Sequence, residues 1–522
     1  MKSTFIKSTL AASLAMAVST ITTGIQAGGF PGWGHPSISI EKAGGYTGTG
    51  AEISAYDADS ERMFVVTGGT SVDILDFSDP YAPSLAGNID VSGIGGGANS
   101  IAVKNGVVAI AVENDDHVLD GFVAFYDTDG NYITEVTVGA LPDMLTFTPR
   151  GRKIVVANEG EPDDDYIVDP EGSVSVIDMS GGAYVLTQAD VSTISFTDFN
   201  AGGSRNSELD PEIRIFGPGA TVAQDLEPEY IAVGPRGRRA WVAMQENNAM
   251  AVIDLKKNRV VRMVSLGFKD HSKPGNAMDA SNRDDAINIA NWPTLGMYQP
   301  DAIAGYSFRG RQYIISANEG DARDYDGFSE EERVKDLALD LTVYPDAATL
   351  QEDGNLGRLK TTTANGDADG DGLYEQIFSY GARSFSIWNA KGQLVYDSGD
   401  EFERITAAAT PELFNSQDND PGEFDDRSDD KGPEPEGVVV GRIRGRNYAF
   451  IGLERIGGIM VYDVTLPWKP RHVQYLPAAV GDVSPEGLVF IPARKSPNGK
   501  PLLVVSYEDS GTIAVFDINS NK

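Results

Sequence analysis

Short segments in which hydrophobic and polar residues alternate recur along the chain, and turns rich in glycine, proline and acidic residues separate them. A repeat starts with a proline and an acid, continues with an alternating strand, and then has an apolar strand that ends in a second acid. After a loop, a third strand ends in aspartate or asparagine. Such segments at regular spacing indicate many small antiparallel sheets. The clearest repeats begin at Pro142, Pro228, Pro300, Pro435 and Pro485, and two weaker ones begin at Glu52 and Asn99.

Seven such repeats predict a β-propeller, because a propeller blade is a four-stranded unit of roughly 40 residues. The last repeat stops after its third strand, at Asp517, whereas residues 37–40 alternate ahead of the first repeat. We expect this N-terminal segment to supply the missing outer strand and close the ring, which leaves no long free sheet edge. The sequence thus predicts an all-β protein in which residues 28–522 form a single seven-bladed β-propeller, closed by an N-terminal strand, with long insertions on one face.

Two acidic positions in each repeat are expected to meet at one mouth of the central channel. Successive strands of a blade run antiparallel, so the start of the first strand and the end of the second lie on the same face. Carboxylates gathered there repel each other unless cations neutralise them or some stay protonated. Calcium is the expected cation because it takes roughly six to eight oxygen ligands. The alternative for any single acid is a strand cap that binds backbone N–H groups. The predicted metal ligands are Glu159, Glu229, Asp301, Glu319, Asp321, Glu436 and Glu486.

Four insertions interrupt the repeats and are expected on the same acidic face, where long loops over a rigid scaffold often bind ligands. In the third insertion, Ser329 and Glu332 form a capping box that predicts the start of a helix. Val334, Leu337 and Leu341 would form the buried stripe of that helix. The insertions span about 192–227, 268–299, 320–381 and 405–433.

A second candidate calcium site lies within the third insertion. Asp367, Asp369 and Asp371 alternate before a glycine, and Glu375 stands where a calcium loop has its ninth-position ligand. The twelfth position is Phe378 rather than glutamate, so the segment is not an ordinary EF-hand. The sequence predicts a calcium loop here, and the alternative is a solvated acidic turn.

Composition narrows the classes of partner. The chain carries 77 acidic and 42 basic side chains, for a net charge of −35. A nucleic acid would be repelled, whereas divalent cations, or anions bridged by them, would be attracted. The absence of cysteine excludes disulfides, thiolate zinc sites and iron–sulfur clusters. The acidic runs at 163–165 and 425–426 lack ligand spacing and are interpreted as solvated loops.

The N-terminus has the pattern of a secretion signal. Lys2 and Lys7 precede a short apolar run at 10–18, and Ala27 ends a plausible cleavage site. We therefore expect residues 1–27 to be a signal peptide and the protein to be secreted, into the periplasm or outside the cell. The apolar run is too short for a membrane span, and we expect no span elsewhere and a monomeric protein.

Signatures of common hydrolases are missing, since the chain has neither a Gly-x-Ser-x-Gly nor a His-Glu-x-x-His motif and only four scattered histidines. Basic residues in the insertions are candidates for holding a phosphate or another anion beside bound metal. The alternative is that each pairs with a nearby acid. These candidates are Arg205, Arg323, Arg427 and Lys431.

Six segments of the chain resemble the choice-of-anchor I family, and together they span nearly all of it. They lie at 170–178, 226–230, 296–301, 317–323, 381–388 and 427–437. The family includes mesenchyme-specific glycoproteins of skeleton-forming cells, and many bacterial members carry the label alkaline phosphatase. The resemblance implies a secreted propeller with a role involving calcium or mineral. This sequence lacks the serine and zinc residues of ordinary alkaline phosphatases and the cysteine of calcium–iron ones.

Two functions follow as hypotheses. In the first, the protein binds calcium at the channel mouth and acts in extracellular surface, matrix or mineral interaction. In the second, it is a calcium-dependent phosphoesterase, alkaline phosphatase-like or phytase-like, in which calcium ions at the same site bind phosphate and activate water.

Overall fold

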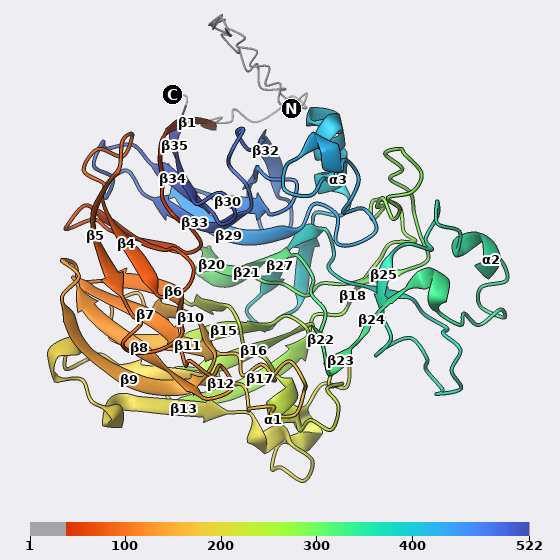
Figure 1. The fold of residues 1–522 in the computed structure, drawn as a ribbon, viewed down its shortest axis with the longest axis horizontal. Coiled ribbons are helices and arrows are strands. Elements are labelled where there is room, and N and C mark those ends of the chain that lie inside the picture. The colour runs from red at the N-terminus through yellow and green to blue at the C-terminus, as the bar shows by residue number, and fades with distance from the viewer. Residues whose placement is uncertain (1–37, 521–522) are drawn as a thin grey trace, which may run out of the picture. The chain divides into compact units, whose positions relative to one another are not determined.

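The structure is a computed structural model that describes residues 38–520, and β-sheets dominate it (Figure 1). These residues contain seven four-stranded antiparallel sheets, each built in the chain order that the repeats predicted. The predicted signal peptide, 1–27, lies outside the described residues. Within residues 38–520, no helix combines the length and the apolar character needed to cross a bilayer.

The first three sheets come from consecutive strands. They are β2 (Ser54–Asp57), β3 (Arg62–Val66), β4 (Ser71–Asp76) and β5 (Ser84–Asp90); β6 (Gly97–Lys104), β7 (Val107–Glu113), β8 (Asp120–Asp127) and β9 (Tyr132–Ala140); and β10 (Pro142–Phe147), β11 (Lys153–Asn158), β12 (Ser173–Asp178) and β13 (Val191–Ser195).

The next three sheets follow the same order, with one long insertion inside the fifth. They are β14 (Ile231–Val233), β15 (Arg239–Met244), β16 (Ala249–Asp254) and β17 (Arg259–Ser265); β20 (Ile303–Phe308), β21 (Arg311–Asn318), β27 (Ser384–Asn389) and β28 (Leu394–Asp397); and β29 (Pro435–Ile443), β30 (Arg446–Leu453), β31 (Ile459–Asp463) and β32 (Arg471–Leu476).

The seventh sheet joins the two ends of the described chain. Its order is β33 (Pro485–Ile491), β34 (Leu502–Tyr507), β35 (Thr512–Ser520) and then β1 (Ile38–Thr47). β1 pairs antiparallel with β35, from Ile38 opposite Ser520 to Thr47 opposite Thr512. The predicted closure by an N-terminal strand is confirmed from Ile38 onward.

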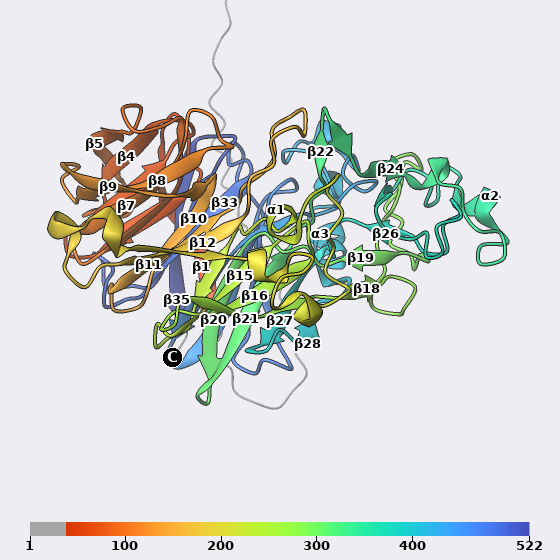
Figure 2. The same ribbon diagram turned by 90° about the horizontal axis from the view of Figure 1, so that it is seen from below.

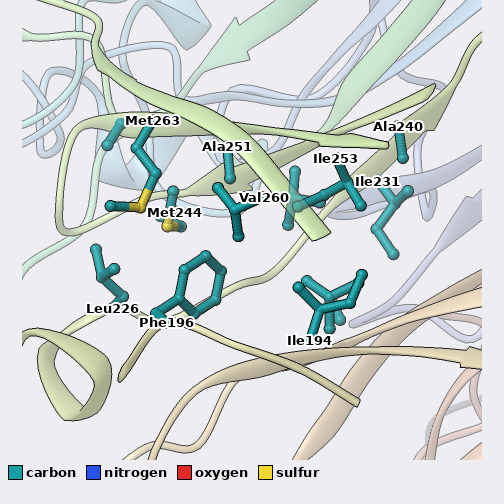
Figure 3. Close-up of a cluster of buried hydrophobic side chains, with 14 of the residues drawn as sticks. Ile194, Phe196, Leu226, Ile231, Ala240, Met244, Ala251, Ile253, Val260 and Met263 are labelled. Atoms are coloured by element: carbon teal, nitrogen blue, oxygen red, sulfur yellow. The ribbon is translucent and has the colours of Figure 1, made fainter. Parts of the chain in front are cut away.

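The first strands of the seven sheets contact one another in a closed cycle, β2, β6, β10, β14, β20, β29, β33 and back to β2. This cycle of small sheets around one axis is the architecture of a β-propeller. Neighbouring sheets pack through apolar side chains, as Figure 3 shows for Ile194 and Phe196, which share one buried cluster with Met244 and Val260.

Two of the insertions combine into a separate sheet beside the blades (Figures 1 and 2). Its strands are β18 (Phe268–Asp270), β19 (Leu295–Met297), β26 (Phe378–Ser379), β25 (Lys360–Thr362) and β24 (Glu331–Arg333), and β22 (Asp324–Tyr325) pairs with β23 (Phe328–Ser329) nearby. A small apolar core that includes Val334, Leu337 and Leu359 supports this part of the fold.

Helices are few and short. The α-helices are α1 (Val222–Asp225), α2 (Ala347–Leu350) and α3 (Glu401–Ala409). The 3-10 helices are η1 (Ala183–Val185), η2 (Gln188–Asp190), η3 (Thr197–Phe199), η4 (Asn206–Glu208), η5 (Val334–Asp336), η6 (Pro411–Leu413) and η7 (Pro421–Glu423).

The predicted helix after Ser329 is wrong. Residues 331–333 form β24 and pair with β25, which satisfies the backbone groups that a helix would have used. Glu332 does not close a capping box, because its carboxylate accepts the N–H of Arg333 instead. Val334 and Leu337 are buried as expected, but Leu341 is 68% exposed.

Closure through β1 generates a stability prediction. Ile40 is 2% exposed and packs in the cluster that holds Leu476 and Ile518. We expect Ile40→Ala to lower the free energy of unfolding by about 2–5 kcal/mol. Because the ring closes at β1, the loss should appear as an earlier melt of the whole propeller in scanning calorimetry. The exposed neighbour Glu41, changed to alanine, is the control. If the Ile40 variant showed only a small, separate transition at lower temperature while the main transition of the propeller stayed unchanged, closure at this strand would be contradicted.

Candidate functional site

In five blades the proline and acid that defined the repeats lie at the start of the inner strand or just before it, and the backbone there is unusual. The residue before the proline adopts a left-handed conformation in four of the five blades, at Leu141 (φ 43°), Gln299 (φ 36°), Glu434 (φ 48°) and Ser484 (φ 58°). In β10, β29 and β33 the pairing register then shifts just after the proline. Such irregularities re-aim a side chain. Because of these irregularities, the side chain of the acid does not follow the usual alternation between the two faces of the sheet.

A repeated backbone hydrogen bond brings the second acid of a blade to the same end. The N–H of Glu159 donates to the carbonyl of Leu141 over 2.8 Å, and the N–H of Glu454 donates to Glu434 over 2.8 Å. The N–H of Glu508 makes the equivalent bond to Ser484 over 2.9 Å. The start of the first strand and the end of the second are therefore joined, as the antiparallel geometry predicted.

A cavity of about 270 Å³ lies inside the ring at these acids. Its walls come mainly from β2, β6 and β10, and Asp143, Asp301, Glu486 and Tyr230 also line it. We use the name channel mouth for the carboxylates of Asp143, Glu159, Glu229, Asp301, Glu319, Glu436 and Glu486. Three of them, Asp143, Asp301 and Glu486, line the cavity, and the other four interact electrostatically with Asp143 or Asp301.

Two groups of carboxylates at the channel mouth are close enough to share an ion. Oxygens of Asp301, Glu319 and Glu436 all lie within 4.8 Å of one another. Oxygens of Glu319, Glu434 and Glu454 form a second group with the same spacing, so Glu319 belongs to both.

Several of these carboxylates lack hydrogen-bond partners. One buried oxygen of each of Glu229, Glu436 and Glu486 accepts no hydrogen bond. A buried polar atom without a partner costs roughly 1–3 kcal/mol, and more if it is charged. These oxygens are not strand caps, because a cap would accept a backbone N–H. They are free to bind a ligand.

Burial and mutual repulsion raise the pKa values around the mouth. Burial, followed by the charge of Glu161, raises the pKa of Asp143 to about 7. Burial and the charge of Glu508 raise the pKa of Glu52 to about 7. The pKa values of the most enclosed acids are raised well above their ordinary range, first by burial and then by neighbouring carboxylates. These acids are Glu159, Glu229, Asp301, Glu436 and Glu486.

Lys431 places a positive charge beside Glu319 at the mouth. Its Nζ lies 2.9 Å from Glu319 Oε1 and 3.4 Å from Asp321 Oδ1. Burial would lower the pKa of Lys431, but the charges of Glu319 and Asp321 hold it well above its ordinary value. Asp321, a predicted ligand, is 56% exposed at the side chain and stands at the rim. Gly320 has φ 95° between these two acids, and a Cβ there would lie 2.0 Å from the backbone of Gly381.

The other three predicted anion-binding residues pair with acids: Arg323 and Arg205 outside the two mouth groups, and Arg427 with Glu434 of the second group. Arg323, expected to face a ligand, is 1% exposed at the side chain and pairs with Asp225 and Glu227. Arg205 pairs with Glu208 and also donates to the Val260 carbonyl of the outer strand β17, away from the mouth. In the last pair, Arg427 Nε lies 2.6 Å from Glu434 Oε1. In the structure all three arginines therefore pair with acids, which was the alternative interpretation of these residues.

The predicted calcium loop has a compact geometry. Carboxylate oxygens of Asp367, Asp369, Asp371 and Glu375 lie within 4.8 Å of one another. The backbone N–H groups of Gly370 and Gly372 donate to Asp367 over 2.7 and 2.9 Å, and Ala368 N–H donates to Glu375 over 2.8 Å. The loop thus brings all four predicted ligands together, separately from the channel mouth.

Sequence reasoning missed Tyr230 and Glu434. Tyr230 lines the cavity, where burial and the charges of Asp301 and Glu486 raise the pKa of its hydroxyl. Glu434 is fully buried beside Glu319 and Glu454. Both residues adjoin a proline–acid pair in the sequence, which is the signal that points to them.

A family model described as the choice-of-anchor I domain matches residues 52–467, which include all the carboxylates named above as the channel mouth except Glu486. The chain belongs to the choice-of-anchor I family. Among characterised relatives, Gigasin-3a of Magallana gigas is 31% identical over 191 residues, which cover 33% of this chain and 67% of Gigasin-3a.

The mesenchyme-specific cell surface glycoprotein of Strongylocentrotus purpuratus is 27% identical over 318 residues. That match covers 52% of this choice-of-anchor I chain and 40% of the glycoprotein, so the chain spans less than half of that relative. Among solved structures, the WD40 domain of Toxoplasma gondii coronin aligns with a TM-score of 0.47, 10% identity and coverage of 93% of this chain and 87% of that one.

A β-propeller domain from Myceliophteria thermophila aligns with a TM-score of 0.45 and 9% identity, over 92% of this chain and 100% of that one. The assignment of this chain as a propeller rests on its own sheet topology.

The raised pKa values generate a prediction for stability against pH. A carboxyl whose pKa is raised by folding binds its proton more tightly in the folded protein than in the unfolded chain. Its contribution to stability is therefore complete below the unfolded pKa and is lost as the pH rises through the folded pKa. With chelator present, we expect the melting temperature to fall between about pH 5 and about pH 8.

The matched variant is Glu436→Gln with Glu486→Gln, which removes two of the repelling charges and should make this fall shallower. Calorimetry at constant ionic strength measures both proteins. A melting temperature that stays level or rises over this interval in the unsubstituted protein would show that the mouth carboxylates do not govern its stability.

Proposed function

We propose that this choice-of-anchor I propeller binds a divalent cation, calcium, at the channel mouth and acts in interactions at an extracellular surface or matrix. The observation that carries the proposal is the set of buried oxygens of Glu229, Glu436 and Glu486 that have no hydrogen-bond partner. A cation at the adjoining group of Asp301, Glu319 and Glu436 would relieve the repulsion that raises their pKa values.

The chemistry of the donors supports calcium. Every donor in the two mouth groups is a carboxylate oxygen, which is the ligand type of hard cations. Transition metals favour imidazole or thiolate donors, and neither is present in these groups. The loop with Asp367 and Asp371 has the same donor type and would be a second, more exposed calcium site.

The extracellular role is supported by a relative. The Strongylocentrotus purpuratus protein is named as a cell surface glycoprotein, and it matches 52% of this chain. We infer that this chain also acts outside the cell, in agreement with the secretion signal expected at 1–27.

Phosphoester hydrolysis at the same mouth has less support. Cationic side chains beside the metal would strengthen the binding of a phosphate there. Lys431 is held by Glu319, Arg323 by Asp225 and Arg427 by Glu434. These pairs favour a site that accepts a cation over one that accepts an anion.

The test is calcium titration of the double variant Glu319→Gln and Glu436→Gln. Glutamine keeps the shape of each side chain but removes its charge, so the mouth should lose its calcium while the fold persists. Isothermal titration calorimetry should then show fewer bound ions than in the unsubstituted protein. The control variant, Asp59→Asn with Glu61→Gln, removes two exposed charges from the turn between β2 and β3.

Unchanged calcium stoichiometry and affinity in the mouth variant would rule out the mouth as the metal site. A loss of equal size in the control variant would mean that net charge, and not the site, governs binding. The melting temperature of the mouth variant in chelator should be at or above that of the unsubstituted protein, since repulsion is removed.

A further inference from the structure

The acidic run at 425–426, which lies in the segment between α3 and β29 and was interpreted from the sequence as a solvated loop, is solvated only at Asp426. Asp425 is 3% exposed, and Asn415 and Ser416 are fully buried. The two ends of the segment are held side by side, because Asp425 N–H donates to the Phe414 carbonyl over 2.9 Å and Arg427 N–H donates to the Asn415 carbonyl over 2.8 Å. The loop is therefore closed at its base, where Asn415, Ser416 and Asp425 are buried, while its tip at 420–423 is exposed.

Three oxygens in this loop have no partner. They are Asn415 Oδ1, Ser416 Oγ and Asp425 Oδ2. The second polar atom of Asn415 and that of Asp425 both bond to Ser428. The Ser428 hydroxyl donates to Asp425 Oδ1 over 2.5 Å and accepts from Asn415 Nδ2 over 2.9 Å. Native proteins rarely leave so many buried oxygens unpaired within one short segment.

Negative charge from another insertion faces the loop. Burial raises the pKa of Asp425 to about 8, and the charges of Asp279 and Asp284 add to the rise. The insertion with Asp279 is tied to the loop by Arg383, which donates to the carbonyls of Asp279 and Ser428. The charge of Arg383 is already balanced, because its guanidinium pairs with Glu403 over 2.7 Å. No cationic side chain of the described residues pairs with Asp425 or Asp279 in an ion pair.

Protonation of Asp425 would not satisfy all three oxygens. A proton on Asp425 Oδ2 makes one hydrogen bond, so at most two of the three oxygens would gain a partner. A hard cation accepts oxygen ligands of all three kinds, namely carboxylate, amide and hydroxyl.

We propose that residues 415–425 hold a second buried divalent cation, of the calcium class, with Asp425 as the charged ligand and Asn415 and Ser416 as neutral ligands. The ion would fasten the connection between the fifth and sixth blades to the insertion that carries Asp279. This site is independent of the channel mouth, since none of its ligands belongs to the mouth groups.

The experiment isolates this site in the full chain. The background variant carries Glu319→Gln, Glu436→Gln, Asp367→Asn and Asp371→Asn, which neutralise the mouth and the exposed loop. Isothermal titration with calcium should show about one remaining equivalent, and adding Asp425→Asn should remove it. Adding Asp426→Asn instead is the matched control, because Asp426 is the exposed neighbour.

A second variant and a second readout cover the case in which Asp425→Asn does not fold. Ser416→Ala keeps the charge and should weaken calcium binding in the same background by about tenfold or more, the scale set by partners around metal sites. Calcium should also slow proteolysis within 405–433 in the unsubstituted protein and in the Asp426 control.

A background variant that binds no calcium, or one whose remaining calcium is unaffected by both Asp425→Asn and Ser416→Ala, would overturn the proposal. The unsubstituted mouth is not used in this comparison. Failure here therefore leaves the proposed function standing, and failure of the mouth variant leaves this site standing.

Discussion

Repulsion among buried carboxylates at one end of the propeller is the constraint that the rest of the molecule has to meet. Glu229, Asp301 and Glu436 come from different blades, yet each has its pKa raised by burial and by acids on other blades. Burying unpaired negative charges in this part of the protein costs free energy, so the carboxylates must share protons or bind cations. Lys431 offsets part of the charge near Glu319 but does not contact Glu229. The remaining excess of negative charge is the basis for the proposal that the mouth holds a cation.

Ring closure is what allows this arrangement to persist. Each blade contributes a buried apolar layer to its neighbour, and the β1–β35 pairing joins the last blade to the first. A blade cannot move away from the repelling mouth without exposing the layers on both of its sides. Closure thus supplies through apolar burial what the chain cannot obtain from disulfides, since it contains no cysteine. The site and the stability of the fold are two aspects of the same ring.

The blades and the convergence of acids could be predicted from the sequence, because both depend on local alternation and on antiparallel topology. The strands that end at Asp76, Asp178 and Asp254 lie where the pattern predicted them. Contacts between residues far apart in the chain could not be predicted from the local pattern. The partners of Arg323 lie about a hundred positions away in the chain, and the strand at 331–333 forms because residues 360–362 pair with it. The burial of Asp425 was missed for the same reason, because it depends on contacts with a different insertion.

The two ends of a single blade show why position matters more than residue type. Asp178 ends the third strand on the face opposite the mouth, where hydrogen bonds from Ser180 lower the pKa of its carboxyl. Asp143 starts the first strand of the same sheet, and there burial raises its pKa to about 7. The first acid is a turn cap whose oxygen accepts a backbone N–H. The second lines a cavity among other carboxylates. Strand capping therefore explains the acids at one end of the propeller, and the acids at the other end require a proton or a cation.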